Sequence, residues 1–498
     1  MTSEILDMID GSRQQALKQA QCIQISKELI SFSFHADHHL IQTTALYLEL
    51  SVMNLIENGL PEEDENRMEL RIAARDAFRL LKALPRLDDP LEDGLFLLRT
   101  SALAVLGDRG VDASRWLREI EWPELPIDSQ DWMERTWATV VDVWLRLIRK
   151  NGWSDRDIVL ERVSSLRDAQ ALLEKEMLQK LDSSNAKSTA LELIALYHLA
   201  KAAEIFAHYI TDGVVDGKYQ IQQLLDTHFD KTLVACQHAM MIHLEPLTIL
   251  LYVATSQMVE NSIWSVTRAV NSRVEYFVKT LIDRGRGDKV IFDVLPPQRQ
   301  VLAEKGLLGS SRRAVVVSLP TSSGKTMIAE FRILQALNQF AMDRGWVAYL
   351  VPTRALVHQV CRQLRKDLSD LEINVERISP VLEIDSIESD LLQNDERENE
   401  FHVLVTTPEK MNLLLRQDWE AKIDRPLTLV IVDEAHNIQN AQRGLHLELL
   451  LATVNSECRY AQFLLLTPFI ENAHEVARWL GGSNSQDISL TVDWQPND

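Results

Sequence analysis

The sequence predicts an α + α/β protein, in which an all-helical N-terminal region precedes a parallel sheet with helices on both faces. Three observations predict this. Glycine and proline are scarce, at 17 and 15 of 498 residues, so long helices can form. Apolar residues recur at three- and four-residue spacing through residues 1–283. After that, short apolar runs alternate with helical stretches, which is typical of a parallel sheet.

The helical region is expected to span residues 1–283, followed by a linker at 284–289 with the sequence RGRGDK. The clearest amphipathic segments are 74–87, 133–150, 171–181 and 191–210, with breakers at 57–64, 125–130, 150–155 and 211–217. The segments resemble paired-helix repeats but show no fixed period. Two subdomains and a set of helical repeats therefore both stay open.

Two clusters in the helical region could carry function. Six of the 11 tryptophans lie between Trp116 and Trp153, and they could stack on bases or pack between helices. Acidic neighbours would repel phosphate, so we favour packing. A second cluster, HADHH, could bind metal, but adjacent histidines on a helix point apart, so no metal site is expected. Its candidate ligands are His35, Asp37, His38 and His39.

Charge and cysteine content restrict the class of protein. There are 73 acidic and 52 basic residues, a net charge of −21, which argues against a broadly basic nucleic-acid surface. The 4 cysteines are far apart, which is typical of a reducing, cytoplasmic location. The acidic N-terminal segment is not typical of a signal peptide. We expect no membrane span, because no run of about 18 apolar residues occurs.

The region 290–498 contains the apolar runs expected to form the sheet. In a parallel sheet of this kind, ligands bind beyond the carboxyl ends of the strands. The expected strands are 314–319, 346–351, 402–407, 427–434, 462–467 and 488–493.

A phosphate-binding loop is predicted directly after the first of these strands. The segment Leu319–Thr326 ends in Gly-Lys-Thr and leads into a helix, so its amides and the helix N-terminus would face phosphates. Lys325 would bind the β- and γ-phosphates, and the Thr326 hydroxyl would bind Mg²⁺. Leu319 stands where the motif usually has its first glycine. The loop residues expected to surround the phosphates are Thr321, Ser322, Ser323 and Gly324.

A second motif, Asp-Glu-Ala-His at 433–436, follows an apolar strand farther along the chain. Asp433 at the end of that strand would position Mg²⁺, and Glu434 would act as the general base on the attacking water. His436 completes the set of catalytic candidates. The phosphate loop and this motif together predict a nucleoside triphosphate site.

With both motifs present, region 290–498 resembles the first RecA-like domain of superfamily 2 DEAD/DEAH-box helicases. Residues 295–298 resemble the glutamine motif, which implies that Gln298 recognises adenine. Residues 351–356 and 406–410 resemble motifs Ia and Ib, which grip the backbone of a single strand in the family. The resemblance thus assigns nucleic-acid contacts to Pro352, Thr353, Arg354, Thr407 and Lys410.

Finer features are similar to the superkiller-like branch of that superfamily. They are the segments 471–473, 478–481 and 492–496. Motif III departs from the usual Ser-Ala-Thr: it is Thr467-Pro468-Phe469, which implies altered coupling between nucleotide and strand. The family's second RecA-like domain, with its arginine finger, has no counterpart before Asp498. We therefore expect a truncated or split gene product that hydrolyses ATP poorly by itself.

The expected function is that of the N-terminal portion of an ATP-dependent helicase or translocase. Its ligands would be ATP with Mg²⁺ and a nucleic-acid strand, single-stranded or duplex, with DNA and RNA both open. An alternative is an interaction protein whose helical region binds a protein partner and whose ATPase domain is regulatory or vestigial, by analogy with bacterial anti-phage proteins. A signalling P-loop ATPase is disfavoured, because it has no use for motifs Ia and Ib.

Overall fold

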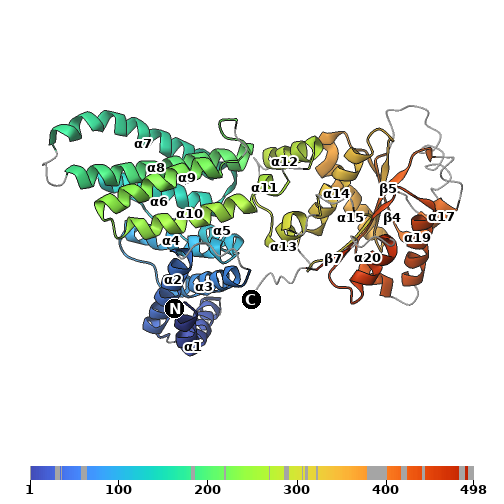
Figure 1. Cartoon of the computed structure of the whole chain (residues 1–498), viewed down its shortest axis with the longest axis horizontal. Helices are drawn as coiled ribbons and strands as arrows, with labels where there is room; N and C mark the ends of the chain where they lie inside the picture. The colour runs from blue at the N-terminus through green and yellow to red at the C-terminus, as the bar shows by residue number, and fades with distance from the viewer. Residues whose placement is uncertain are drawn as a thin grey trace. The chain divides into compact units, whose positions relative to one another are not determined.

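The structure of the chain is a computed structural model (Figure 1). Contacts divide the chain into two compact units: Met1–Glu260 with Gly285–Phe292, and Asn261–Arg284 with Asp293–Asp498. The residues that the structure describes are 2–28, 34, 36–57, 64–180, 186–217, 220–267, 270–284, 291–304, 307–308, 312–320, 323–377, 401–416, 423–439, 443–481 and 488–491.

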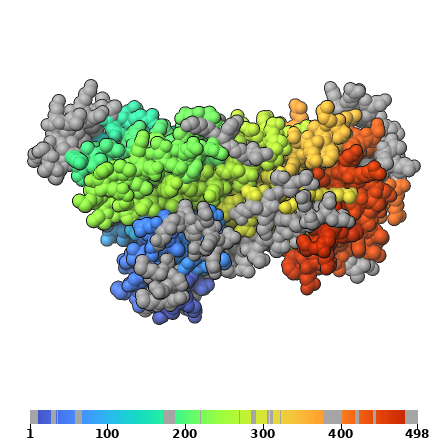
Figure 2. Space-filling view, in the orientation of Figure 1, coloured from blue at the N-terminus to red at the C-terminus, as the bar shows by residue number. Residues whose placement is uncertain are grey.

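The regular elements that the structure describes in the first unit are all helices, as predicted. Contacts link neighbours along the chain, such as α2 with α3 and α8 with α9, and α9 and α10 form part of the surface in Figure 2. The helices are α1 (Thr2–Glu28), α2 (His38–Glu57), α3 (Asp64–Ala83), α4 (Pro90–Leu106), α5 (Gly110–Glu119), α6 (Trp132–Arg149), α7 (Gly152–Lys180), α8 (Ala186–Asp212), α9 (Gln222–Ala239) and α10 (Leu244–Asn261).

Local sequence explains where these helices begin and end. Asp89 caps α4 by accepting hydrogen bonds from the amides of Leu91 and Glu92, and Asp131 caps α6 in the same way. Helix α6 ends where Lys150 adopts a left-handed conformation. The breaker predicted at 150–155 is shorter than expected, because α7 already begins at Gly152.

The tryptophans of this unit pack against protein groups. Trp144 is fully buried, and Trp116 lies edge-on to Phe78 with ring centroids 5.9 Å apart. The Trp122 indole donates a hydrogen bond to Asp142 (3.1 Å), and the Arg149 guanidinium lies 3.9 Å above its ring. These contacts favour the interpretation that the tryptophans pack between helices, because these three rings already have protein partners.

The histidine cluster near the N-terminus gives no metal site in the described residues. His38 and His39 are exposed at the start of α2, and His35 lies outside the described residues. Among the residues that the structure describes, no group of three potential ligands could hold a metal ion. No helix in the described part of the chain is long and apolar enough to cross a membrane.

The second unit contains a parallel sheet in the strand order β3-β4-β2-β5-β6-β1-β7. Six of its strands fall within the predicted runs. Every residue of β1, β2, β4, β5 and β6 is buried, and these strands are mostly apolar, as is typical of parallel strands covered on both faces. The edge strand β3 was not predicted, because it is short and two of its three residues are charged. The strands are β1 (Ala314–Ser318), β2 (Trp346–Leu350), β3 (Val375–Arg377), β4 (Val403–Thr406), β5 (Leu427–Val432), β6 (Gln462–Thr467) and β7 (Ile488–Thr491).

Helices cover both faces of the sheet (Figure 1). One face packs against α17 (Pro408–Leu415), α19 (Arg443–Glu457) and α20 (Ala473–Gly481) around a buried apolar cluster. On the other face, α14 (Lys325–Gln339) contacts β2 and β5, and α15 (Arg354–Leu368) contacts β3 and β4. This arrangement confirms the predicted α/β class.

The boundary between the units differs from the one expected at residue 283. The segment Asn261–Arg284, with the helices α11 (Ile263–Thr267) and α12 (Ser272–Arg284), groups with the sheet. The physical reason is that Phe277 of α12 packs edge-on against Phe331 of α14, with centroids 5.8 Å apart. Of the expected linker 284–289, all but the first residue lie outside the described residues.

Candidate functional site

Apart from Gln298, which precedes β1, the predicted site residues follow the carboxyl ends of strands in the sheet. The phosphate loop follows β1, the motif Ia segment follows β2, Thr407 follows β4, and Asp433 follows β5. Because the strands are parallel, these ends lie at one edge of the sheet. The fold thus brings groups from distant segments of the chain to a single edge of the sheet.

The phosphate loop is described from Ser323 onward, and Thr321 and Ser322 lie outside the described residues. The buried Ser323 hydroxyl donates a hydrogen bond to the Pro320 carbonyl (2.7 Å), which closes a tight turn. Gly324 then adopts a left-handed conformation (φ 73°), and α14 begins at Lys325. The first turn of α14 thus starts with Lys325 and Thr326, as the motif requires.

Gln298 lies against this loop. It belongs to the short helix α13 (Pro296–Arg299). Its side chain is only 4% exposed, its Oε1 accepts a hydrogen bond from the Leu295 amide (2.8 Å), and its Nε2 donates one to the Gly324 carbonyl (3.2 Å). The glutamine motif and the phosphate loop are therefore in direct contact.

Lys325 faces the acidic motif. Its Nζ lies 3.8 Å from Oε1 of Glu434, and the side chain of Lys325 is 12% exposed. Apart from this ion pair, the Nζ atom has no hydrogen-bond partner among the described residues. A buried ammonium with one distant carboxylate is incompletely compensated, and an anion such as phosphate would supply the missing hydrogen bonds.

Asp433 is held at the end of β5. Its amide donates to the Leu350 carbonyl (2.9 Å), and its Oδ1 accepts from the Glu434 amide (2.9 Å). Burial raises the pKa of Asp433 above its usual value, and the Glu434 charge adds to this. The hydroxyl of Tyr349 lies 3.5 Å from its Oδ2, and burial raises the pKa of that phenol well above its usual value. A cation beside Asp433 would oppose the rise in the carboxyl pKa.

Glu434 has a fixed backbone next to Asp433. It adopts a left-handed conformation (φ 51°), and its carbonyl accepts a hydrogen bond from the Asn437 side chain (2.8 Å). His436 Nδ1 lies 3.3 Å from Glu434 Oε2, so the predicted catalytic pair is in contact. Sequence reasoning did not identify Tyr349 or Asn437. A signal for Tyr349 was available, since it is the only hydroxyl in its otherwise apolar strand.

The candidates for nucleic-acid contact differ in exposure. Thr353 and Arg354 are exposed at the start of α15, where the Thr353 hydroxyl accepts a hydrogen bond from the Leu356 amide (3.4 Å). Pro352 and Lys410 are half-buried, and Thr407 is buried at the start of α17. Arg354 therefore presents its charge to solvent, whereas Thr407 has little side-chain surface to offer.

A small cavity of about 20 Å³ lies between the strand ends that carry these motifs. It joins the motif Ia, motif Ib and Asp-Glu-Ala-His segments, and it also brings the Glu409 carboxylate to the edge. Its lining includes Pro352, Pro408, Glu409, Asp433, Glu434 and Asn437.

Motif III lies at the same edge, after β6. The Thr467 hydroxyl accepts a hydrogen bond from the Phe469 amide (3.2 Å), and Thr467 itself is buried. This turn leaves the Phe469 side chain 67% exposed. The departure from Ser-Ala-Thr thus places an aromatic ring in solvent at the end of a strand that pairs with both β5 and β1.

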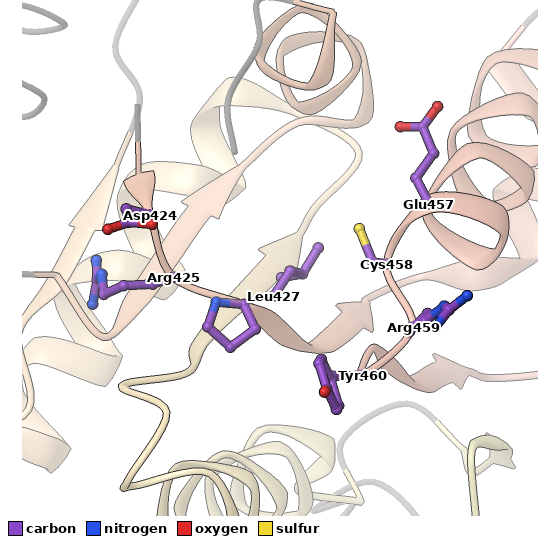
Figure 3. A pocket seen from close by; sticks show the side chains of 8 residues that line it. Asp424, Arg425, Leu427, Glu457, Cys458, Arg459 and Tyr460 are labelled. Carbon is purple, nitrogen blue, oxygen red and sulfur yellow. The ribbon is translucent and has the colours of Figure 1, made fainter. Parts of the chain in front are cut away.

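A larger cavity, of about 390 Å³, lies at the opposite edge of the sheet (Figure 3). Its residues lie at the amino ends of β5 and β6, and they include two acidic and two basic side chains. Because the phosphate loop follows a carboxyl end, this cavity is separate from the candidate site. The lining residues are Asp424, Arg425, Pro426, Leu427, Glu457, Cys458, Arg459 and Tyr460.

Comparison with known proteins places this site in a family. Residues 296–475 match the model of the DEAD/DEAH box helicase family. The ATP-dependent DNA helicase Hel308 of Thermococcus kodakarensis is 30% identical over 228 residues, which cover 46% of this chain and 17% of that protein. The ATP-dependent DNA helicase MER3 of Saccharomyces cerevisiae is 30% identical over 185 residues, which cover 36% of this chain and 14% of that protein.

Among solved structures, the crystal structure of the helicase MrfA bound to DNA and AMPPNP aligns with 45% of this chain and 29% of that chain, at 20% identity and a TM-score of 0.33. The chain spans less than a fifth of the lengths of the Hel308 and MER3 proteins named above. Residues 296–475 are a DEAD/DEAH box helicase domain of superfamily 2, with a helical region before it.

Proposed function

We propose that this chain binds ATP with Mg²⁺ at the carboxyl edge of β1 and β5, and that it is the ATP-binding portion of a nucleic-acid helicase. The observation that carries the proposal is the placement of the buried Lys325 ammonium 3.8 Å from Glu434, beside Asp433. A phosphate group between these charges would satisfy the ammonium, and a divalent cation would offset the carboxylates.

Each residue has a role that its position supports. Lys325 binds the terminal phosphates, together with the loop amides of Ser323 and Gly324. Thr321 and Ser322, which the sequence also assigns to this loop, lie outside the described residues. Thr326 and Asp433 supply a hydroxyl and a carboxylate, which are oxygen ligands of the kind that Mg²⁺ prefers. When bound, Mg²⁺ would neutralise charge that develops on the phosphates.

Glu434 accepts a proton from the attacking water, and His436 orients its carboxylate through the 3.3 Å contact. Gln298 recognises adenine. Its amide retains one N–H and one lone pair after its bonds to Gly324 and Leu295, and adenine offers a matching acceptor and donor.

The nucleic-acid strand would cross the same edge at motifs Ia and Ib. Arg354 supplies the exposed charge, with Pro352 and Thr353 before it and with Thr407 and Lys410 on the neighbouring segment. The Hel308 and MER3 relatives are named as DNA helicases, so DNA is the first strand to test. An interaction protein with a vestigial ATPase domain is less well supported, since the charged groups that nucleotide binding would use, Lys325, Asp433 and Glu434, lie at the same edge of the sheet.

The proposal predicts that Lys325→Ala weakens binding of an ATP analogue by about ten- to a hundredfold, the loss expected for hydrogen bonds to a charged group. Fluorescence titration of the full chain measures this. Lys366→Ala, on the exposed side of α15, removes the same charge away from the loop and is the matched control. Equal affinity of the Lys325→Ala variant and the wild type would contradict the site assignment.

A further inference from the structure

Gln298 and the phosphate loop fit each other without spare room. A Cβ atom added to Gly324 would lie 2.2 Å from Gln298 Nε2, which is inside any allowed contact distance. The same Nε2 atom donates a hydrogen bond to the Gly324 carbonyl (3.2 Å). The Gln298 side chain therefore packs directly against the backbone at Gly324 and binds its carbonyl.

The helix that carries Gln298 cannot hold that position by itself. Helix α13 has four residues and continues directly into a π-helical turn of five residues (Gln300–Glu304), and a helical segment this short is unstable without tertiary contacts. The next residue, Arg299, is buried, and its Nη1 donates a hydrogen bond to Oδ1 of Asn261. The guanidinium thus fixes α13 to a residue far away in the sequence.

The backbone supports the same link. The Val294 amide donates to the Asn261 carbonyl (3.0 Å), and Ser262 forms an antiparallel bridge with Asp293. Asn261 is the last residue of α10 and directly follows Glu260, the last residue of the first segment of the first unit. A continuous path of contacts therefore runs from the end of α10 through α13 to Gly324.

We propose that Asn261 and Arg299 are positioning residues that hold Gln298 on the phosphate loop, so that nucleotide binding is set from the end of α10. The inference rests on the proposed function only for its nucleotide readout. The contacts from Asn261 to Gly324 all lie within the second unit. Neither residue touches the nucleotide in this proposal, because both act through Gln298.

The test compares Asn261→Ala with the wild-type full chain by two measurements. Hydrogen exchange of the peptide that covers 319–327 reports the loop without nucleotide, and titration with an ATP analogue reports affinity. We expect faster exchange and a loss of affinity of about three- to tenfold, the size of one hydrogen bond. Asn261→Asp keeps an acceptor for Arg299 and should restore both values.

Asn271→Ala is the matched control. Asn271 lies in the same segment, and its side chain accepts a hydrogen bond from the Val274 amide (3.0 Å) at the start of α12. Loss of this bond should lower thermal stability without changing loop exchange or affinity. If Asn261→Ala does not fold, Arg299→Lys, which keeps the charge but not the planar donor group, takes its place in both measurements.

Combination with Gln298→Ala decides whether the effect passes through that side chain. We expect the double variant to exchange and bind like Gln298→Ala alone. Additive effects, or an unchanged loop in Asn261→Ala, would overturn the inference. Faster exchange with unchanged affinity would overturn its link to nucleotide. A wild type that binds no ATP analogue would refute the proposed function instead, while the exchange measurement still tests the path from Asn261.

Discussion

At the scale of single residues, two histidines of the helical unit form an unusual contact. His198 of α8 and His228 of α9 place their Nδ1 atoms 2.9 Å apart, so one ring must donate and the other accept. Burial is the main cause that lowers the pKa of His228 to about 4. The charges of His198, Lys231 and Lys201 lower this pKa further, and the Glu204 charge partly opposes them. Burial and Lys231 also lower the pKa of His198.

This pair predicts acid sensitivity. In the folded state His228 takes up a proton only near pH 4, whereas in the unfolded chain it does so near pH 6.5. Between these two pH values the unfolded state therefore binds more protons than the folded state. Stability from His228 is therefore fully present above pH 6.5 and is lost as the pH falls toward about 4. We expect the thermal midpoint of the wild type to fall more steeply over this range than that of His228→Gln, measured by circular dichroism.

The control for this experiment is His238→Gln, at an exposed position near the end of α9. It removes a histidine without touching the pair, so its pH dependence should follow the wild type. Parallel curves for wild type and His228→Gln would show that the pair does not govern acid stability.

At the scale of elements, α6 is held by charges that are buried with their partners. Asp142 is fully buried and accepts hydrogen bonds from the Trp122 indole (3.1 Å) and from Arg146 Nε (2.9 Å). Arg149, on the same helix, covers the Trp122 ring. Asp155, at the start of α7, receives Arg149 Nε at 2.9 Å. These contacts fix the loop before α6 and the turn after it.

We predict that Asp142→Ala destabilises the helical unit by about 3 to 5 kcal/mol, because it removes a fully buried carboxylate. The Trp122 indole N–H then loses its acceptor, and Arg146 keeps one carboxylate contact, that of its Nη1 with Asp155 at 3.3 Å. Urea denaturation followed by circular dichroism measures the change. Asp112→Ala, which removes a more exposed carboxylate paired with Arg109 at 3.4 Å, should cost less than about 1 kcal/mol. Similar losses for both variants would contradict the special role of the buried network.

At the scale of the whole molecule, the net charge of −21 restricts how a strand can bind. The chain as a whole repels nucleic acid at long range, so affinity must come from short-range contacts at the carboxyl edge. Few contacts mean a shallow dependence on salt, since each phosphate neutralised on a single strand contributes about 0.7 to the slope.

Arg354→Ala should therefore weaken binding of single-stranded DNA to a similar extent for all sequences and reduce the salt slope by less than about one unit. Titrations at several salt concentrations measure both quantities. Arg362→Ala, at an exposed position farther along α15, removes the same charge away from the strand ends and should bind like the wild type. Superimposable curves for wild type and Arg354→Ala would remove Arg354 from the proposed strand path.

Much of the second unit could be predicted from local sequence. Strands buried on both faces are mostly apolar along their length, which is why runs such as 314–319 and 462–467 predicted β1 and β6. The Gly-Lys-Thr segment needs a strand before it and a helix after it, and both are present. The edge strand β3 was missed, because at an edge pairing with one neighbour suffices and charged residues are tolerated.

The sequence by itself determined which residues could serve chemistry, because the phosphate loop and the Asp-Glu-Ala-His segment each encode their own turn and strand end. Only the tertiary structure decided which groups meet: the Lys325 ammonium with Glu434, Gln298 with Gly324, and Arg299 with Asn261. It also decided that α12 belongs with the sheet, through Phe277 and α14. These contacts join segments far apart in the chain, and they depend on how whole elements pack, which no local pattern of residues records.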